Sequence, residues 1–360
     1  MKNIAIFIKS LYSGTGGAEK QALLLYECLR MKYNVFIIVF KGDKINRKYS
    51  NVISSDTHEH MILKGNLIKR LMNLYSALKR EKVDIIFSYL ASTNFWGAVI
   101  GRLANVDYIV GGIRNSEFET HKLFVQKIVH NYLSDYTIFN NYRGYHNLTE
   151  KGFNKNKSVV IPNGLFIRDP IETRKVKSPL KIITVARFTG QKDYLTAIHA
   201  MKYLLENLHV SPGNFSYNII GNGKLQEQIE EWIRDNNLTQ VISVVKNPPN
   251  LKDYFAEADI YLCTSRFEGV SNSILEAMSF NLPVIATDAG DNNKLVMNDY
   301  NGYIVNISDY KTIAIRLYEL INSYDKRIAL GVRGYNHCRQ NYSSEVFQAS
   351  YVSFINKLSR

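Results

Sequence analysis

With 360 residues, 46% of them hydrophobic, the chain is long enough for two domains with buried cores, and this composition excludes a disordered protein. Its net charge is +13, and the excess is concentrated in residues 1–165, which hold 23 Lys and Arg against 12 Asp and Glu. No apolar run reaches the ~18 residues of a membrane span. The three cysteines show no metal-binding spacing, and their odd number with no paired pattern suits the reducing cytoplasm.

The first half of the chain alternates short apolar runs with helical patterns, which predicts a parallel sheet with crossover helices. The expected strands are residues 4–8, 35–40, 85–87, 108–110, 137–139 and 159–161. The expected helices are residues 18–31, 66–81, 94–104, 118–134 and 142–151. Together they predict one doubly wound domain. Its basic charge favours an anionic partner, with anionic lipid, a pyrophosphate-bearing acceptor and nucleic acid as the alternatives.

The turn after the first strand is rich in glycine, which lets a backbone approach a ligand at the carboxyl end of a strand. Its sequence is Ser13-Gly14-Thr15-Gly16-Gly17-Ala18-Glu19. This is not the dinucleotide fingerprint, because Glu19 stands where the third glycine belongs. The residues alone leave two interpretations open, a phosphate site and a plain tight connection.

Residues 64–82 combine an apolar stripe at helical spacing with surrounding cations. The stripe comprises Leu67, Ile68, Leu71, Leu74, Tyr75 and Leu78, and the cations are Lys64, Lys69, Arg70, Lys79, Arg80 and Lys82. We interpret the segment as a crossover helix with a solvated basic side. The alternative is a patch that docks on anionic lipid of the inner leaflet. Because a stripe buried in the fold cannot also enter a membrane, that alternative rests on the charges alone.

The first domain contains a second candidate binding loop, and a further turn closes the domain. Arg114 and Asn115 follow the fourth strand, at the sheet edge where open α/β sheets bind ligands, so they are candidates for acceptor or phosphate contact. Ile161-Pro162-Asn163-Gly164 closes the domain, and residues 165–180, with two prolines and several cations, are predicted to be a linker.

The second half opens with an expected strand at 181–186 and a loop that bears two cations, Arg187 and Lys192. A rigid guanidinium fork and a flexible ammonium group suit phosphate oxygens, although two unrelated surface cations are the simpler alternative. The other expected strands are 217–220, 241–245, 260–263, 284–286 and 302–305, and the last expected helices are 308–323, 325–340 and 344–358.

Residues 259–290 read as strand, loop, helix and strand, with Glu268 before the helix and Glu276 inside it. A helix start offers unpaired N–H groups and a positive dipole end, which suit a phosphate. Glu276 lies about 6 Å further along the axis and could accept hydrogen bonds from ribose hydroxyls. The alternative is that Glu268 is a loop charge and Glu276 a solvated helix residue.

The order Glu268-Gly269, then Leu275-Glu276-Ala277-Met278, then Pro283-Val284-Ile285-Ala286-Thr287 resembles the donor-site signature of the retaining glycosyltransferases of family four. The resemblance implies the α/β GT-B fold, in which two doubly wound Rossmann-like domains face each other across a cleft. It places an acceptor-binding domain at 1–165 and a nucleotide-sugar-binding domain at 166–342. A final helix within 343–360 would pack back on the first domain.

The resemblance also implies roles for particular residues. Arg187, Lys192 and Glu268 would be catalytic, with the two cations on the donor diphosphate and Glu268 on the sugar. The implied donor-binding residues are Gly16, Gly17, Arg187, Lys192, Gly221, Asn247, Glu268, Gly269, Val270, Ser271, Asn272 and Glu276. Many relatives carry a histidine where this chain has Arg114 and Asn115, which leaves the acceptor side less defined.

The resemblance implies a retaining, metal-independent transfer from a nucleotide-diphosphate sugar, UDP-linked, to a glycan acceptor. The basic first domain and the lack of a membrane span suggest a lipid-linked acceptor, as in surface polysaccharide (O-antigen or capsule) biosynthesis. We expect no metal cofactor, since the sequence shows no Asp-x-Asp motif and no histidine cluster. We also expect peripheral contact of the basic first domain with an anionic membrane, at the inner face of the cytoplasmic membrane. A sugar-nucleotide 2-epimerase of the same fold is one alternative function. A basic nucleic-acid-binding protein is the other, disfavoured because aromatic residues are not interleaved with the basic runs.

Overall fold

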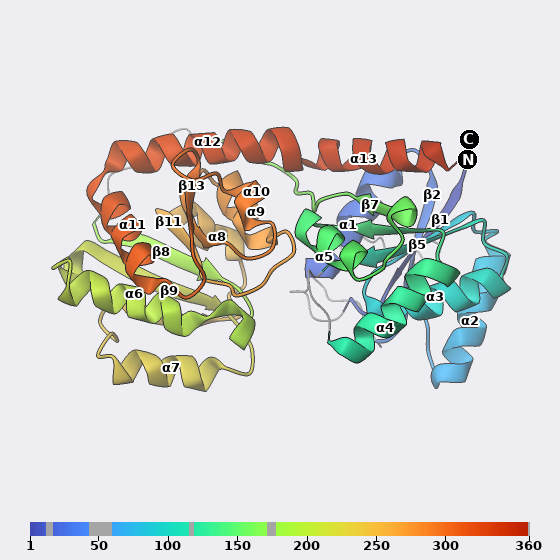
Figure 1. The fold of residues 1–360 in the computed structure, drawn as a ribbon, viewed down its shortest axis with the longest axis horizontal. Coiled ribbons are helices and arrows are strands. Elements are labelled where there is room, and N and C mark those ends of the chain that lie inside the picture. Colours follow the sequence, from blue (N-terminus) through green and yellow to red (C-terminus); the bar gives the residue numbers. More distant parts are fainter. Residues whose placement is uncertain (12–16, 43–59, 115–118, 171–177, 359–360) are drawn as a thin grey trace. The chain divides into compact units, whose positions relative to one another are not determined.

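The computed structural model describes residues 1–11, 17–42, 60–114, 119–170 and 178–358 (Figure 1). The chain divides into two compact units. Unit 1 consists of Met1–Gly164 with Ser344–Arg360, and unit 2 consists of Leu165–Ser343. These divisions lie one residue from the boundaries expected from the sequence. Both units contain a single sheet in which every strand pair is parallel, so the expected α/β class is confirmed.

The sheet of unit 1 has seven strands in the order β3-β2-β1-β4-β5-β6-β7. Its strands are β1 (Asn3–Ile8), β2 (Asn34–Val39), β3 (His60–Ile62), β4 (Ile85–Ser88), β5 (Tyr108–Ile113), β6 (Tyr136–Phe139) and β7 (Ser158–Val160). All but β3 were expected. β3 is an edge strand of three half-buried residues, which is too short to give a recognisable apolar run.

The helices of unit 1 follow the expected positions with one difference. They are α1 (Gly17–Leu29), α2 (Leu67–Arg80), α3 (Ala91–Leu103), α4 (Thr120–Ile128), α5 (Tyr142–Glu150) and α13 (Ser344–Lys357). The single helix expected at 118–134 is in fact α4 followed by a π-helical turn, η2 (Val129–Leu133). The burial pattern does not separate these two forms, because Gln126, Val129 and His130 are buried at a helical spacing across their junction.

The side chains of β1 point alternately to the two faces of the unit 1 sheet, and helices cover both faces. Ile4, Ile6 and Ile8 pack in one cluster with α1 and α13, whereas Ala5 and Phe7 pack in another with α2 and α3. The last helix, α13, buries Tyr351, Phe354 and Ile355 in the first of these clusters. Val346 of the same helix is only half-buried, whereas Phe347 is buried in this cluster. Helix α13, a segment of 14 residues near the end of the chain, therefore helps to complete the core of unit 1.

Unit 2 repeats the same topology with six strands in the order β10-β9-β8-β11-β12-β13. Its strands are β8 (Leu180–Val185), β9 (Phe215–Gly221), β10 (Ile242–Lys246), β11 (Ile260–Cys263), β12 (Val284–Thr287) and β13 (Gly302–Val305). Its helices are α6 (Tyr194–Glu206), α7 (Gln226–Asp235), α8 (Leu251–Glu257), α9 (Asn272–Ser279), α10 (Asn292–Leu295), α11 (Tyr310–Asn322) and α12 (Tyr324–Tyr342). The strand order reverses between β8 and β11, and a doubly wound sheet binds its ligands outside the carboxyl ends of such a strand pair.

The segment that follows Gly164 packs as part of unit 2. The backbone N–H of Leu165 donates to the Tyr342 carbonyl at 2.9 Å, and the Arg168 guanidinium lies 5.0 Å from the centre of the Phe280 ring. The Arg168 carbonyl also accepts a hydrogen bond from the Tyr335 hydroxyl at 2.6 Å. The first part of the expected linker is therefore held by packing and hydrogen bonds.

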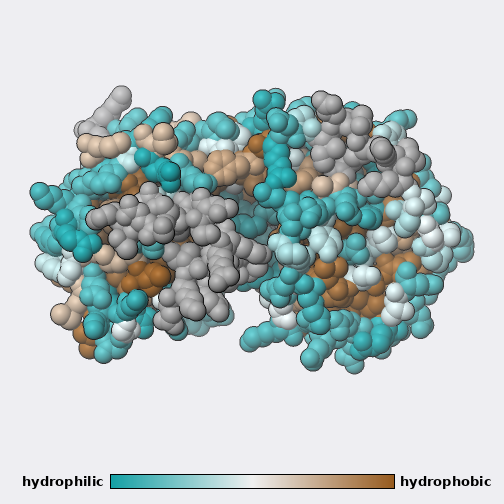
Figure 2. All heavy atoms as spheres, turned by 180° about the vertical axis from the view of Figure 1, so that it is seen from behind, coloured by the Kyte–Doolittle hydropathy of each residue, from teal (hydrophilic) through white to brown (hydrophobic). Residues whose placement is uncertain are grey.

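On the face drawn in Figure 2, hydrophobic residues form separate patches between hydrophilic ones. Among the helices that the structure describes, none combines the length and the apolar character needed to cross a membrane.

Candidate functional site

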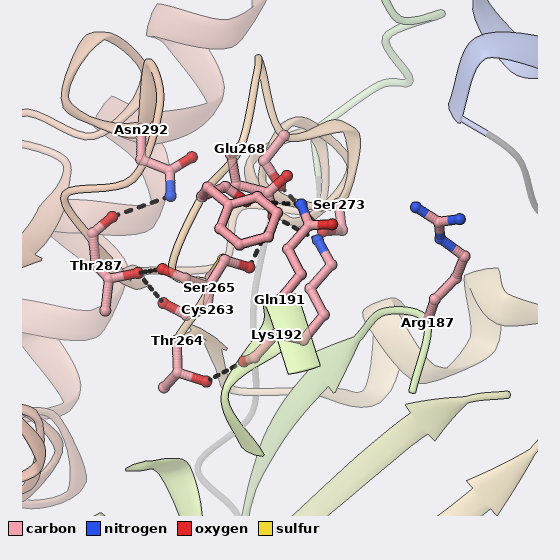
Figure 3. A network of polar contacts seen from close by, with 12 residues as sticks. Arg187, Gln191, Lys192, Cys263, Thr264, Ser265, Glu268, Ser273, Thr287 and Asn292 are labelled. Atoms are coloured by element: carbon pink, nitrogen blue, oxygen red, sulfur yellow. Dashed lines mark hydrogen bonds and ion pairs between the residues drawn. The ribbon is translucent and has the colours of Figure 1, made fainter. Parts of the chain in front are cut away.

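Two loops of unit 2 meet at the carboxyl ends of β8 and β11, where the strand order reverses (Figure 3). The backbone N–H of Arg266 donates to the Gln191 carbonyl at 2.8 Å, and the Gln191 side-chain amide donates to the Phe267 carbonyl at 2.6 Å. The Thr264 hydroxyl donates to the Lys192 carbonyl at 2.8 Å. These bonds join loops that are more than 70 residues apart in the sequence into one rigid surface.

Lys192 and Glu268, which the sequence analysis assigned to the donor site, form an ion pair in this surface. The Lys192 ammonium donates to Glu268 Oε1, and the two side chains are only 12% and 10% exposed. The Ser265 hydroxyl donates to the same oxygen at 2.7 Å, and the Cys263 thiol donates to Ser265 Oγ at 3.5 Å. Burial, and the nearby Glu268 charge, raise the pKa of Cys263, so this cysteine is a neutral donor beneath the pair.

Arg187 lies on the same β8 loop but belongs to no such pair. Its side chain is exposed, and within the described residues no carboxylate lies at ion-pair distance from it. Its carbonyl accepts a hydrogen bond from the Tyr194 hydroxyl at 3.1 Å, which fixes the backbone while the guanidinium extends outward. Figure 3 shows this guanidinium apart from Lys192 and Glu268. The site thus offers one paired and one unpaired cation.

Asp193, to which the sequence analysis gave no role, holds the loop that carries Lys192. Its backbone is left-handed, with φ 49° and ψ 55°, and its side chain is 3% exposed. The carboxylate accepts hydrogen bonds from Arg266 Nε at 3.0 Å, from the Thr196 hydroxyl at 2.9 Å and from the Ser308 hydroxyl at 3.2 Å. A buried carboxylate needs such partners to offset its desolvation, so these bonds fix the backbone next to Lys192.

Helix α9 begins at Asn272, with Ser271 as its N-cap. The Ser271 side chain makes no cap hydrogen bond; its hydroxyl instead lies 3.2 Å from that of Ser273. The positive end of the helix dipole therefore lies directly after the Glu268 loop and is not covered by its own N-cap side chain. Gly269, Val270 and Ser271 are buried, whereas Asn272 and Glu276 are half-buried. Glu276 follows one turn further along α9.

Gly290 was not predicted to belong to the site, but its backbone packs directly against the backbone of Glu268. It adopts a left-handed φ of 57°. A Cβ atom at this position would overlap the Glu268 carbonyl oxygen and lie 2.7 Å from the Gly269 carbonyl oxygen. The next residue, Asp291, donates its N–H to the Gly269 carbonyl at 3.0 Å. Only glycine fits both this conformation and this close approach.

We expect Gly290→Ala to lower the free energy of unfolding of the protein by about 2 kcal/mol, because the left-handed conformation and the steric overlap both penalise a Cβ. Gly190→Ala is the matched control, since a Cβ there meets nothing within 4 Å. Urea denaturation of both variants measures the difference. Equal stability of Gly290→Ala and the parent would show that the Glu268 loop is not held as described.

The remaining predicted residues of unit 2 lie at the ends of the neighbouring strands. Gly221 has a φ of 157°, and a Cβ there would overlap the Ala186 carbonyl oxygen, so β9 approaches the Arg187 loop closely. Asn247 donates its N–H to the Gly221 carbonyl at 3.1 Å, and its side chain accepts a hydrogen bond from Asn222. Both predicted residues thus share the carboxyl edge of the sheet with Arg187.

The predicted residues of unit 1 form a separate group. Gly17 is the first residue of α1, whereas Gly16 and Asn115 lie outside the described residues. Arg114 donates from Nη1 to Asn163 Oδ1 at 2.8 Å, and its guanidinium stacks over the Tyr89 ring at 4.2 Å. In the described part of the chain, no group of three or more His, Cys, Asp or Glu side chains is placed to hold a metal ion.

Comparison with known proteins finds similar proteins among the glycosyltransferases. Residues 167–337 match the family model of the glycosyl transferases group 1. The chain is similar to the UDP-Gal:alpha-D-GlcNAc-diphosphoundecaprenol alpha-1,3-galactosyltransferase of Escherichia coli, at 28% identity over 262 residues and 67% of each protein. It is also similar to the GalNAc-alpha-(1->4)-GalNAc-alpha-(1->3)-diNAcBac-PP-undecaprenol alpha-1,4-N-acetyl-D-galactosaminyltransferase of Campylobacter jejuni, at 21% identity over 352 residues and 94% of each protein.

Among solved structures, Anabaena Alr3699/HepE in complex with UDP-glucose has a TM-score of 0.84 to this chain. The alignment covers 99% of this chain and 100% of that one. Because the sequence identity is only 15%, the similarity shows the fold alone. The two doubly wound parallel sheets, the match of unit 2 to this family model and the shared fold lead to one conclusion: the chain is a glycosyltransferase with the GT-B fold, and its residues 167–337 match the group 1 family.

Proposed function

We propose that the protein transfers a sugar from a UDP-linked donor to a lipid-linked glycan during synthesis of a surface polysaccharide such as O-antigen or capsule. The observation that carries this proposal is the pairing of Lys192 with Glu268 beside the unpaired Arg187, at the point where the unit 2 strand order reverses. Cations suit a diphosphate and a carboxylate suits sugar hydroxyls, so one surface offers ligands for both parts of a nucleotide sugar.

In the proposed donor complex, Arg187 and Lys192 bind the diphosphate. An ammonium group can donate several hydrogen bonds, so Lys192 can contact Glu268 and a phosphate oxygen together. The N-terminal end of α9, from Asn272, adds its positive dipole. Glu276 accepts hydrogen bonds from the ribose hydroxyls, and Asn247 and Gly221 lie beside the base.

Chemically, the bond between the anomeric carbon and the diphosphate oxygen breaks, and the diphosphate leaves with the electron pair. An acceptor hydroxyl forms the new bond to that carbon, and its proton passes to the leaving diphosphate. Negative charge grows on the leaving oxygen, and fixed cations stabilise it without reorganising during the reaction. We propose that Arg187 and Lys192 do this without a divalent ion. Glu268 orients the sugar, and the product retains the anomeric configuration of the donor.

The names of the relatives support a lipid-linked acceptor, since the Escherichia coli and Campylobacter jejuni enzymes are named for diphosphoundecaprenol-linked and PP-undecaprenol-linked acceptors. We propose an acceptor of this class, bound through unit 1 with Arg114 among its contacts, and peripheral contact of unit 1 with an anionic membrane at the inner face of the cytoplasmic membrane. The expected epimerase alternative has no specific observation in its favour. Incubation with donor alone distinguishes it, because an epimerase turns over without an acceptor.

A donor screen tests the proposal. We expect UDP and UDP-sugars, but not GDP or CDP, to raise the melting temperature, by an amount equivalent to about 2.7 kcal/mol at a hundredfold excess over Kd. Mass spectrometry with a diphosphoundecaprenol-linked acceptor should then show one added sugar, at a rate that excess chelator leaves unchanged.

The outcomes separate the parts of the proposal. Stabilisation by another nucleotide would refute the UDP assignment, and loss of transfer on adding chelator would refute metal independence. Inversion of the anomeric configuration, read by NMR of the product, would refute retention. Transfer only to soluble acceptors would refute the lipid-linked class.

A further inference from the structure

Helix α2 presents an apolar stripe to solvent as well as to the core. Leu74 and Leu78 are buried against the unit 1 sheet, as a crossover helix requires. Ile68, Met72 and Tyr75 are 70%, 64% and 41% exposed. These three residues follow an i, i+4, i+7 spacing, which places them on one face. The expectation that a membrane contact here must rest on charge alone is therefore wrong, because the predicted stripe divides into an inner and an outer part.

Cations without carboxylate partners surround this outer α2 face, which we define as Ile68, Met72 and Tyr75. Helix α2 contains no Asp or Glu, and Glu81 at its C-cap is already paired with Arg80 at 2.7 Å. The cations on or next to α2 that have no ion-pair partner among the described residues are Lys64, Lys69, Arg70, Lys79 and Lys82. An apolar stripe bordered by lysines is typical of a helix that lies in the interface of an anionic membrane.

The same side of unit 1 carries a second exposed apolar stripe, on α4 and η2. Phe124, Ile128 and Tyr132 are 66%, 39% and 77% exposed. Figure 1 shows α2, α3 and α4 on one side of the unit 1 sheet, and the cores agree, since α2, α3 and η2 share one cluster. The outward-facing apolar residues of this side are therefore not confined to one helix.

The charges of the two sides of the unit 1 sheet differ sharply. On the α2 side, α2, α3, α4 and η2 together hold seven Lys and Arg and no Asp or Glu. On the opposite side, α1 and α13 hold three Glu against two Lys. Three of those seven cations are paired with carboxylates that flank the helices, Arg80 with Glu81, Arg102 with Asp135 and Lys122 with Glu119. The other four have no ion-pair partner among the described residues and lie on the same side as the exposed apolar stripes.

We propose that this side of unit 1 docks on an anionic lipid bilayer, with the outer α2 face inserted among the headgroups. The proposal rests on the proposed function, because a lipid-linked acceptor is presented at such a surface. The charge distribution identifies the occupant: lysines neutralise anionic headgroups while Ile68, Met72 and Tyr75 leave water. A protein partner or a nucleic acid on this face would contradict the proposal.

Vesicle sedimentation of the full chain tests this surface. The parent should bind vesicles of phosphatidylcholine with about 30% phosphatidylglycerol, and bind pure phosphatidylcholine vesicles at least about tenfold more weakly. Ile68→Gln/Met72→Gln should weaken binding to the anionic vesicles about tenfold, because both residues lose their apolar contact. Lys69→Gln/Lys79→Gln should have an effect of similar size that disappears at high salt.

Met31→Gln is the matched control, since Met31 follows α1 and is 79% exposed; its binding should equal that of the parent. Phe124→Gln/Tyr132→Gln provides a second apolar variant, and unchanged melting temperatures show that the variants are folded. Equal binding of Ile68→Gln/Met72→Gln and the parent would overturn insertion of α2. Failure of the parent to bind anionic vesicles, or binding of RNA with the same dependence on α2, would overturn the proposal altogether.

Stabilisation by UDP is measured on the same variants. Intact stabilisation without vesicle binding refutes this surface and leaves sugar transfer standing. Vesicle binding without stabilisation by UDP refutes the donor proposal and leaves this surface standing.

Discussion

Lys192→Met is expected to lower kcat by about 10²–10³-fold, the usual effect of removing one fixed group that stabilises developing charge. The variant takes away a cation for the leaving diphosphate. It also leaves the Glu268 carboxylate, 10% exposed, without its counter-charge, although the Ser265 hydroxyl still donates to it. Steady-state kinetics with a saturating donor measures the change, and Lys192→Arg should retain part of the activity because the positive charge remains.

The control is Lys202→Met, which removes a lysine that lies 3.9 Å from Glu206 in a more exposed pair. Such surface pairs contribute little, so this variant should have the kcat of the parent. A Lys192→Met enzyme with the parent kcat would show that the ion pair serves the fold rather than the reaction. Circular dichroism separates a catalytic loss from an unfolded variant.

Glu276→Ala is expected to weaken UDP binding about 10–100-fold, since hydrogen bonds to a charged group contribute roughly 1.5–3 kcal/mol. Glu276 lies one turn inside α9 and is half-buried, so its carboxylate sits beyond the helix end to which we assign the diphosphate. Isothermal titration with UDP measures the loss. The turnover of saturated enzyme should change less than the affinity, because the ribose does not react.

A nucleotide without ribose hydroxyls makes this prediction specific. If Glu276 binds those hydroxyls, 2′,3′-dideoxyuridine diphosphate should bind the parent and Glu276→Ala with equal affinity. A penalty that persists with the dideoxy nucleotide would place Glu276 elsewhere on the donor. Glu227→Ala, at an exposed position in the first turn of α7, is the matched control and should bind both nucleotides like the parent.

The regular elements were predictable because each buried strand is a short apolar run, and Ile260–Cys263 and Gly302–Val305 were placed with the observed bounds. Prediction failed where the local pattern was weak or ambiguous. β3 has only half-buried residues, and the π-helical turn that follows α4 keeps a helical side-chain pattern. The GT-B fold was predicted from the resemblance of residues 268–287 to the donor-site signature of a family, and not from the regular elements alone.

Within the site, the sequence identified charged residues but not what holds them. Lys192 and Glu268 could be proposed because each is a charge in a loop after a strand, and their contact followed only from the adjacency of β8 and β11. Asp193 has no local signature, since its role depends on Arg266 and Ser308, which are distant from it in sequence. Gly290 could be recognised only after its left-handed backbone was placed beneath Glu268.

Unit 1 is built from both ends of the chain, and this affects the order in which the two hydrophobic cores form during synthesis on the ribosome. Synthesis proceeds from the N-terminus, and domains generally fold as units once their residues have emerged. Unit 2 is a continuous stretch, Leu165–Ser343, whereas the unit 1 core also requires Tyr351, Phe354 and Ile355. Unit 1 is therefore synthesised first but completes its core last. Until α13 has been made, the hydrophobic surface of α1 that packs against it is exposed to chaperones.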